Sequence, residues 1–261
     1  MAEFFDQICK ILAQNAEKHP GHLTADESVR EFFQTVKKTE VVTPSIQNVP
    51  VPPTPPAAQK TPQAAGKPAA PAEKISASSL ENIQQALINC QRCPLCSHRH
   101  NIVFGEGNPH ARLMFIGEGP GYDEDMQGRP FVGKAGQLLD KMIAAMQFTR
   151  AEVYIANIVK CRPDGNRNPM PDEIAKCIPF LHKQIEIIRP EAIVCLGATA
   201  AKALLNTDNG ISRLRGKWCS YQNIPVMPTF HPAFLLRQES AKREAWQDLK
   251  LVMARFGKLP R

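Results

Sequence analysis

The chain has no long apolar run, and this absence bears on where it works. None of its 261 residues lies in a stretch approaching the roughly 20 apolar residues that a membrane-spanning helix needs. The N-terminus, Met1 to Asp6, lacks the basic start and the apolar stretch of a signal peptide. We therefore expect a cytoplasmic protein without membrane contact.

Familiar nucleotide-binding patterns and internal repeats are absent as well. The segment from Gly117 to Gly121 has neither G-x-G-x-x-G nor G-x-x-x-x-G-K-[ST] spacing. Taken alone, this segment fits two interpretations equally well: a tight connection, or a loop whose glycines let a ligand approach the backbone. Eight cysteines are present, and in a cytoplasmic chain they are more often ligands or buried thiols than disulfides.

The net charge of +7 is unevenly distributed. Residues 1–79 hold eight basic and eight acidic side chains, so the whole excess falls on residues 80–261. A basic folded region favours a polyanion such as nucleic acid as partner, although a modest excess also serves solubility.

Composition divides the chain into three parts. Residues 1–40 show two amphipathic helical patterns, at 3–19 and 26–37, and are expected to form a helical extension that could dock a protein partner. The alternative for this part is a weakly folded appendage. Residues 41–78 are expected to be a disordered linker, since nine of the 28 residues from Pro44 to Pro71 are proline. Residues 79–261 form the expected folded domain.

Strand-like and helical patterns alternate in this domain. Short apolar runs lie at 113–117, 153–157, 192–197 and 225–229, and helical patterns at 136–146, 172–189, 198–205 and 243–256. Ser79 begins a further helix that leads to Cys90. This alternation predicts an α/β fold in which helices cover both faces of a four-stranded parallel sheet. The ligand crevice of such a sheet lies beyond the carboxyl ends of its strands.

Three residues near those strand ends are candidates, each with a structural alternative. Asn157 ends an apolar strand and either reads the edge of a base or bonds to the backbone at a turn. Phe131, between two glycines, is either a stacking platform for a flat base or a core residue. His231 precedes a proline just after the last strand and is either functional or a satisfied structural histidine.

Four cysteines are expected to converge on one site. Cys90 and Cys93 form a C-x2-C pair, while Cys161 and Cys177 flank a basic, proline-rich loop. This spacing suits zinc and an iron–sulfur cluster equally well.

Taken together, the motifs resemble the family 4 uracil-DNA glycosylases over roughly residues 87–250. They occur in the order C-Q-R-C-P-L, V-F-G-E-G, I-G-E-G-P-G-Y-D-E-D, G-R-P-F-V-G-K-A-G, I-A-N-I-V-K-C-R-P, N-R-N-P, Cys177, L-G, R-G-K and H-P-A-F-L-L-R. The resemblance implies a three-layer αβα sandwich with a four-stranded parallel sheet. It also implies hydrolysis of the N-glycosidic bond of deoxyuridine in DNA.

The same resemblance implies a [4Fe–4S] cluster and makes zinc the less favoured alternative. Its ligands would be Cys90, Cys93, Cys161 and Cys177. Cys96 falls outside the family's four-ligand pattern, and three other cysteines, Cys9, Cys195 and Cys219, are interpreted as free thiols.

Roles for the site residues follow from the resemblance. Phe131 would stack on the flipped uracil, Asn157 would read its O4 and N3–H, and His231 would donate to O2. Glu118 would position water and stabilise the sugar cation, with help from the backbone N–H of Gly119. The other roles are exclusion of the thymine methyl group by Glu124 and phosphate contacts by Lys160, Arg162, Arg167 and Arg237.

Simple hydrolysis has two alternatives. Related proteins trap uracil-DNA covalently through a histidine in an arginine-rich insertion, but no histidine lies between Cys161 and Cys177. The other alternative is an inactive DNA-binding or polymerase-associated module. The combination of Phe131, Asn157 and His231 favours an active, monomeric enzyme on single- or double-stranded DNA.

Overall fold

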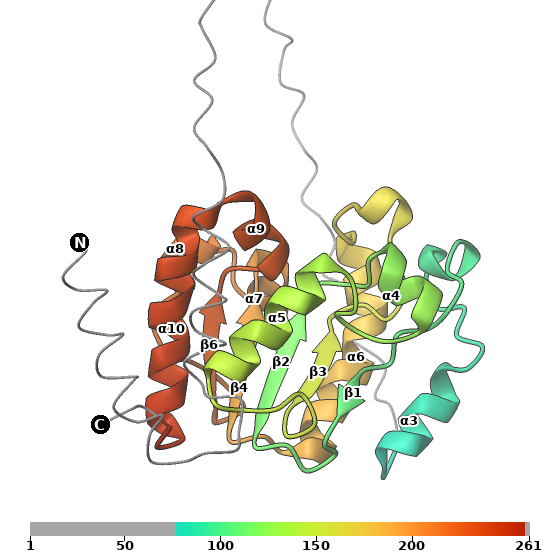
Figure 1. The fold of residues 1–261 in the computed structure, drawn as a ribbon. Coiled ribbons are helices and arrows are strands. Elements are labelled where there is room, and N and C mark those ends of the chain that lie inside the picture. Colours follow the sequence, from blue (N-terminus) through green and yellow to red (C-terminus); the bar gives the residue numbers. More distant parts are fainter. Residues whose placement is uncertain (1–76, 259–261) are drawn as a thin grey trace, which may run out of the picture.

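The computed structural model describes residues 77–258, which form a six-stranded sheet with helices packed around it (Figure 1). The strand order is β1-β3-β2-β4-β6-β5. The strands are β1 (Glu106–Gly107), β2 (Leu113–Gly117), β3 (Tyr154–Asn157), β4 (Ala192–Leu196), β5 (Cys219–Tyr221) and β6 (Ile224–Thr229). The helical extension at 1–40 and the linker up to residue 76 lie outside the described residues, so both stay predictions.

The four predicted strands are β2, β3, β4 and β6, and all of them pair in parallel. The predicted strand count needs a correction, because two short antiparallel strands, β1 and β5, extend the sheet at its edges. Their two and three residues are too short to give an apolar pattern. β5 joins β6 through Gln222 and Asn223, both with positive φ, as a tight hairpin requires.

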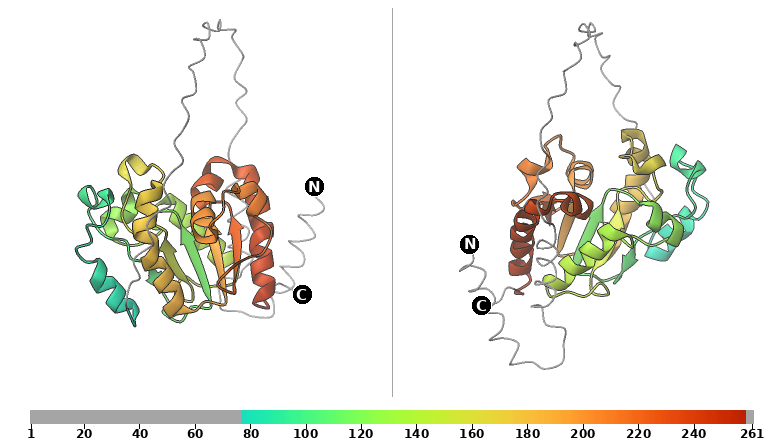
Figure 2. Two further views of the ribbon diagram at one scale, coloured as in Figure 1. Left: turned by 180° about the vertical axis from the view of Figure 1, so that it is seen from behind. Right: turned by 45° about the horizontal axis from the view of Figure 1, so that its top comes forward.

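Helices cover both faces of the sheet, as predicted. On one face lie α5 (Lys134–Ala145), α9 (Pro232–Arg237) and α10 (Lys242–Arg255); on the other lie α3 (Leu80–Leu87), α6 (Pro171–Ile188) and α7 (Ala198–Leu205). Figure 2 shows α6 in front when the molecule is seen from behind. Alternate residues of each strand point to opposite faces, so Phe115 and Met114 belong to different core clusters. The three-layer sandwich is therefore confirmed.

Local signals explain where several helices begin and end. Ser79 caps α3 by accepting a hydrogen bond from the backbone N–H of Asn82 at 3.2 Å. α4 (Tyr122–Gln127) ends at Gly128, whose φ of 69° is left-handed. α8 (Ile211–Leu214) is a single turn. None of the helices within residues 77–258 is long and apolar enough to cross a bilayer.

The parallel register gathers the strand ends at one edge. Gly117 of β2 pairs with Asn157 of β3, and Leu196 of β4 pairs with Thr229 of β6. Figure 1 places α4 and α9 at this same end. The residues that follow the strands therefore face one common space.

Candidate active site

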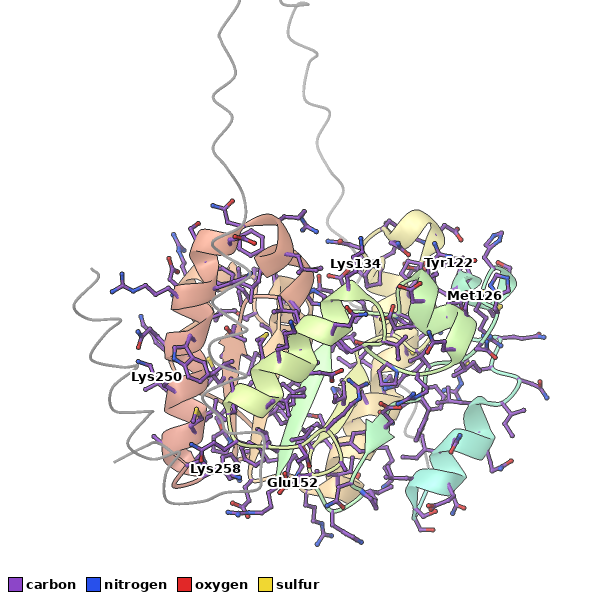
Figure 3. All side chains as sticks on the ribbon, viewed as in Figure 1. Tyr122, Met126, Lys134, Glu152, Lys250 and Lys258 are labelled. Carbon is purple, nitrogen blue, oxygen red and sulfur yellow. The ribbon has the colours of Figure 1, made fainter. Side chains whose placement is uncertain are left out.

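A cavity of about 510 Å³ opens at the carboxyl ends of the strands. Tyr122 and Lys134, which line it, lie at that end in Figure 3, while Glu152 and Lys258 lie at the opposite end. All six residues that are predicted to bind the substrate line this cavity: Glu118, Gly119, Glu124, Phe131, Asn157 and His231.

Asn157 presents an unpaired acceptor to this cavity. The residue is 1% exposed, and among the described residues no donor reaches its Oδ1. Buried acceptors are seldom left without a partner, so an unpaired one at a cavity indicates a ligand that supplies the donor. A Cβ added at Gly117 would lie less than 3.0 Å from both Oδ1 and the ring of Phe131. The glycine therefore makes room for both side chains.

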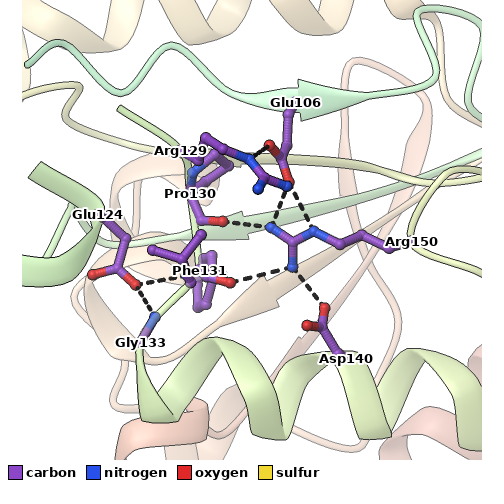
Figure 4. A network of polar contacts seen from close by, with 9 residues as sticks. Glu106, Glu124, Arg129, Pro130, Phe131, Gly133, Asp140 and Arg150 are labelled. Carbon is purple, nitrogen blue, oxygen red and sulfur yellow. Dashed lines mark hydrogen bonds and ion pairs between the residues drawn. The ribbon is translucent and has the colours of Figure 1, made fainter. Parts of the chain in front are cut away.

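Phe131 forms a wall of the cavity with an unusual backbone. Its φ is 52°, the left-handed region that bulky residues rarely adopt, and the ring centroid lies 5.7 Å from that of His231. Arg150 fixes this turn by donating to the carbonyl oxygens of Pro130 and Phe131, the latter at 3.2 Å (Figure 4). The ring also belongs to the apolar core, and its stacking on a base stays a prediction.

Arg150 is itself held by two carboxylates (Figure 4). It pairs with Asp140 at 2.6 Å and with Glu106 at 2.7 Å. Burial raises the pKa of Glu106, but hydrogen bonds from Arg129 and Arg150 outweigh it and lower the pKa overall. The charged network keeps the guanidinium group directed at the Phe131 turn.

Glu124 is committed to the backbone on both of its carboxylate oxygens. Oε2 accepts from the N–H of Gly121 at 3.0 Å, and Oε1 accepts from the N–H groups of Val132 and Gly133 at 2.9 Å each. The carboxylate thereby joins the glycine-rich loop to the Phe131 turn across the cavity. Its role in thymine exclusion stays a prediction, and this bridging role is one that the sequence did not reveal.

His231 has a defined tautomer. It caps α9, and its Nδ1 accepts a hydrogen bond from the N–H of Ala233 at 3.1 Å. The neutral ring must then carry its proton on Nε2. Burial lowers the pKa of His231 to about 4, Arg237 lowers it further and Glu124 acts in the opposite direction. The imidazole is therefore neutral near pH 7.

Glu118 and Gly119 are fixed by an extension of the sheet. Ile158 and Val159 donate to the carbonyl oxygens of Gly117 and Glu118, at 3.0 and 3.1 Å. A Cβ at Gly119 would lie 2.7 Å from the Val159 side chain. The loop therefore enters the cavity with its backbone close to the neighbouring strand.

Three of the four predicted phosphate contacts are arginines near the cavity. Arg167 and Arg237 line it, and Arg162 lies over the ring of Tyr122, with its Cζ 5.0 Å from the centroid. Arg167 is also fixed by a bidentate contact to Glu173, at 2.8 and 2.6 Å. This hydrogen bond is the main cause of the lowered pKa of Glu173.

The fourth predicted phosphate contact, Lys160, is wrong. Its side chain is fully buried and donates from Nζ to the backbone oxygen of Asn157 at 3.0 Å and to Gln184 Oε1 at 2.7 Å. Burial lowers the pKa of Lys160 to about 8, whereas Cys177 and Cys161 act in the opposite direction. An ammonium group in this position cannot reach a phosphate.

The four predicted cysteine ligands gather beside Lys160. Burial raises the pKa of Cys161 to about 11, and Cys93 and Cys90 lie close enough to add to this effect. Burial likewise raises the pKa of Cys177 to about 12, with contributions from Cys161 and Cys93. Cys96 interacts with Cys93 but is not among the groups that shift the pKa of Cys161 or Cys177.

The choice between zinc and an iron–sulfur cluster stays a prediction. Within residues 77–258, no three His, Cys, Asp or Glu side chains are placed to share a single metal ion. A multi-iron cluster binds each thiolate at a different iron and therefore tolerates wider spacing. Two donors already face the sulfurs, namely the backbone N–H of Lys160 to Cys177 Sγ and Arg99 Nη1 to Cys161 Sγ, both at 3.3 Å. The donor set is thus compatible with an iron–sulfur cluster.

Several residues at this site carry no signal in the sequence. Arg150 belongs to no motif, and Asp125 stands in an acidic run that looks like an ordinary helix start. Asp125 is fully buried and accepts hydrogen bonds from the backbone N–H groups of His100 and Asn101. These bonds connect α4 to the segment that follows Cys90 and Cys93 in the chain. A buried carboxylate at a helix start has no sequence signal that separates it from a solvated one.

Comparison with known proteins agrees with this geometry. Residues 104–250 match the family model described as "Uracil DNA glycosylase superfamily". A type-4 uracil-DNA glycosylase of Thermotoga maritima is 47% identical over 62% of this chain and 85% of that protein. The type-4 enzyme of Archaeoglobus fulgidus is 40% identical over 69% of this chain and 94% of its own length. A type-5 uracil-DNA glycosylase of Pyrobaculum aerophilum is only 28% identical.

The chain therefore belongs to the uracil DNA glycosylase superfamily and, within it, to the type-4 uracil-DNA glycosylases. This confirms the resemblance that the motif order indicated.

Proposed function

We propose that the protein is a DNA repair enzyme that flips uracil out of DNA and hydrolyses its N-glycosidic bond, leaving an abasic site. The observation that carries the proposal is the buried, unpaired Oδ1 of Asn157 in one cavity with Phe131 and His231. Uracil offers a donor at N3 and an acceptor at O4, which matches a carboxamide. Cytosine presents the reverse pattern and would leave buried polar groups unpaired.

Chemistry follows from where charge develops. As the glycosidic bond breaks, electrons move onto the uracil O2, and the Nε2–H of neutral His231 is assigned the role of donating to that oxygen. A preorganised donor of this kind is worth about 2.7–4 kcal/mol of transition-state stabilisation. Phe131 stacks on the ring, and the N–H of Gly119 assists at the base. Glu118 positions the water and stabilises the sugar cation.

Specificity and DNA binding complete the proposal. Glu124, fixed by three N–H groups, is assigned the place beside C5, where its bulk excludes the thymine methyl group. Arg162, Arg167 and Arg237 contact phosphates of single- or double-stranded DNA. The enzyme acts as a monomer in the cytoplasm, and the segment at 1–40 is a candidate docking site for a protein partner.

A [4Fe–4S] cluster is proposed to be held by Cys90, Cys93, Cys161 and Cys177. Its contribution is structural: when bound, it orders the loops that face DNA and takes no part in bond breaking. Iron content and a visible absorbance band of the purified protein test this assignment directly.

The deciding experiment measures free uracil released from single-stranded and duplex DNA containing one deoxyuridine. Wild-type protein should release uracil, and Asn157→Ala or His231→Ala should slow release by tenfold or more. Intact substrate after long incubation with iron-replete protein would instead support the inactive DNA-binding module. A covalent protein–DNA adduct would support the trapping alternative.

A further inference from the structure

Lys160 lies between the cysteine site and the base-binding cavity. It ends in an ammonium group although it is fully buried, and its Nζ donates to the backbone oxygen of Asn157 and to Gln184 Oε1. A buried ammonium group persists only where acceptors and negative charge replace its lost hydration. We propose that Lys160 is a positioning residue that holds Asn157 for base recognition and links it to the cysteine site.

The link to Asn157 is direct. Asn157 is the last residue of β3, and its side-chain Oδ1 has no donor among the described residues. Since no donor in the described part of the chain holds Oδ1, the placement of the amide depends in part on the backbone that carries it. That backbone is fixed on one side by the pairing with Gly117 and at its carbonyl oxygen by the Lys160 ammonium group.

The acceptor on the other side of Lys160 is fixed as well. Gln184 Nε2 donates to the backbone oxygen of Phe104 at 3.0 Å and to the Tyr154 hydroxyl at 3.3 Å. These two contacts orient the amide of Gln184 so that its Oε1 faces the ammonium group. The ammonium group of Lys160 therefore lies in a buried site with two oriented acceptors, which a flexible surface lysine would not need.

The link to the cysteine site runs through the backbone. Lys160 precedes Cys161 in the chain, and its backbone N–H donates to Cys177 Sγ at 3.3 Å. Its side chain is anchored at Asn157 and Gln184, so the same residue holds both the end of β3 and the chain segment that leads to Cys161. Loss of iron and loss of Asn157 alignment should therefore be coupled.

The inference rests on the proposed uracil specificity, so its test includes two readouts that need no turnover. Lys160→Met removes the ammonium group but keeps the apolar stem, and Lys202→Met removes a lysine from the exposed face of α7 as a matched control. The first readout is binding of free uracil by equilibrium dialysis. The second is the rate at which a chelator withdraws iron, followed by visible absorbance.

The decisive comparison is a double-mutant cycle with Asn157→Ala. If Lys160 acts through Asn157, Lys160→Met weakens uracil binding and slows single-turnover release at least tenfold in the wild-type background. In the Asn157→Ala background the same change has less than a twofold effect. Iron release becomes at least threefold faster in Lys160→Met and stays unchanged in Lys202→Met.

Equal factors in the two backgrounds would overturn the positioning role, and an unchanged rate of iron release would overturn the coupling to the cysteine site. If Lys160→Met does not fold, the cycle is run with Gln184→Leu, which removes one acceptor and leaves the charge, and the same criteria apply. A wild-type protein that binds uracil but releases none would refute the proposed activity alone, because binding and iron release still test Lys160.

Discussion

Replacement of Arg150 by methionine tests whether its hydrogen bonds to the backbone stabilise the turn that contains Phe131. Arg150 is 23% exposed and donates to the carbonyl oxygens of Pro130 and Phe131. Hydrogen bonds from a charged group contribute about 1.5–3 kcal/mol each, and the partial exposure favours the low end, so the unfolding free energy should fall by about 3 kcal/mol.

The same substitution should reduce activity through the backbone of Phe131. A non-glycine residue in the left-handed region stores about 1–3 kcal/mol of strain, which persists only while its surroundings hold it. Without Arg150 that strain favours a relaxed turn in which the ring leaves the cavity wall. Since about 1.4 kcal/mol is a factor of ten, uracil release at low DNA concentration should fall by a factor of about five to one hundred.

Single-turnover uracil release and thermal unfolding measure the two effects separately. Arg112→Met is the control, because Arg112 forms an exposed ion pair with Glu191 and such pairs contribute about 0–1 kcal/mol. Uracil release that stays within twofold of wild type in a clearly destabilised Arg150→Met protein would refute the reasoning.

Three further predictions concern the cavity itself. Gly117→Ala should abolish most uracil release, because the new methyl group would overlap both Asn157 Oδ1 and the Phe131 ring. Gly210→Ala, where a Cβ meets nothing within 4 Å, should match wild type in the same assay. Glu124→Gln should slow release tenfold or more, since one carboxylate oxygen becomes an NH2 group facing backbone N–H donors; unchanged kinetics would contradict this. The folded-state pKa of His231, about 4, lies below the 6.5 of an unperturbed histidine. Its contribution to stability should therefore be intact above pH 6.5 and fall as the pH drops from 6.5 to 4. The loss is at most ~3 kcal/mol. Urea unfolding of His231→Asn, which still caps α9, should lack this component; an identical pH profile would contradict the assignment.

Much of the fold could be predicted because its strands are buried on both faces. Runs such as Leu113–Gly117 read as continuous apolar segments, and every residue of that strand is buried. The edge strands could not be predicted, since β1 has two residues and takes its place from the pairing of Glu106 with Ile155. That pairing joins residues far apart in sequence.

The candidate site divides in the same way. Asn157 and His231 could be predicted as candidates because they lie at the carboxyl ends of buried strands, where the ligand crevice of a parallel sheet is expected. Lys160 was predicted wrongly because lysine is usually exposed and the basic K-C-R-P context resembles a phosphate site. Its burial depends on Gln184 from another element, and no local pattern reports that contact. Arg150 likewise acts at a turn nineteen residues earlier in the chain.

The missing side chain at Gly117 also limits how this enzyme could be redesigned. The side chains of Phe131 and Asn157 both border the volume that a methyl group at position 117 would occupy. The size of a side chain at any one of the three positions therefore limits the size allowed at the other two. A pocket for a bulkier lesion is best obtained by trimming the aromatic ring, with the glycine left alone. Libraries that keep Gly117 and vary positions 131 and 157 jointly should yield altered base choice more often than saturation of each one singly.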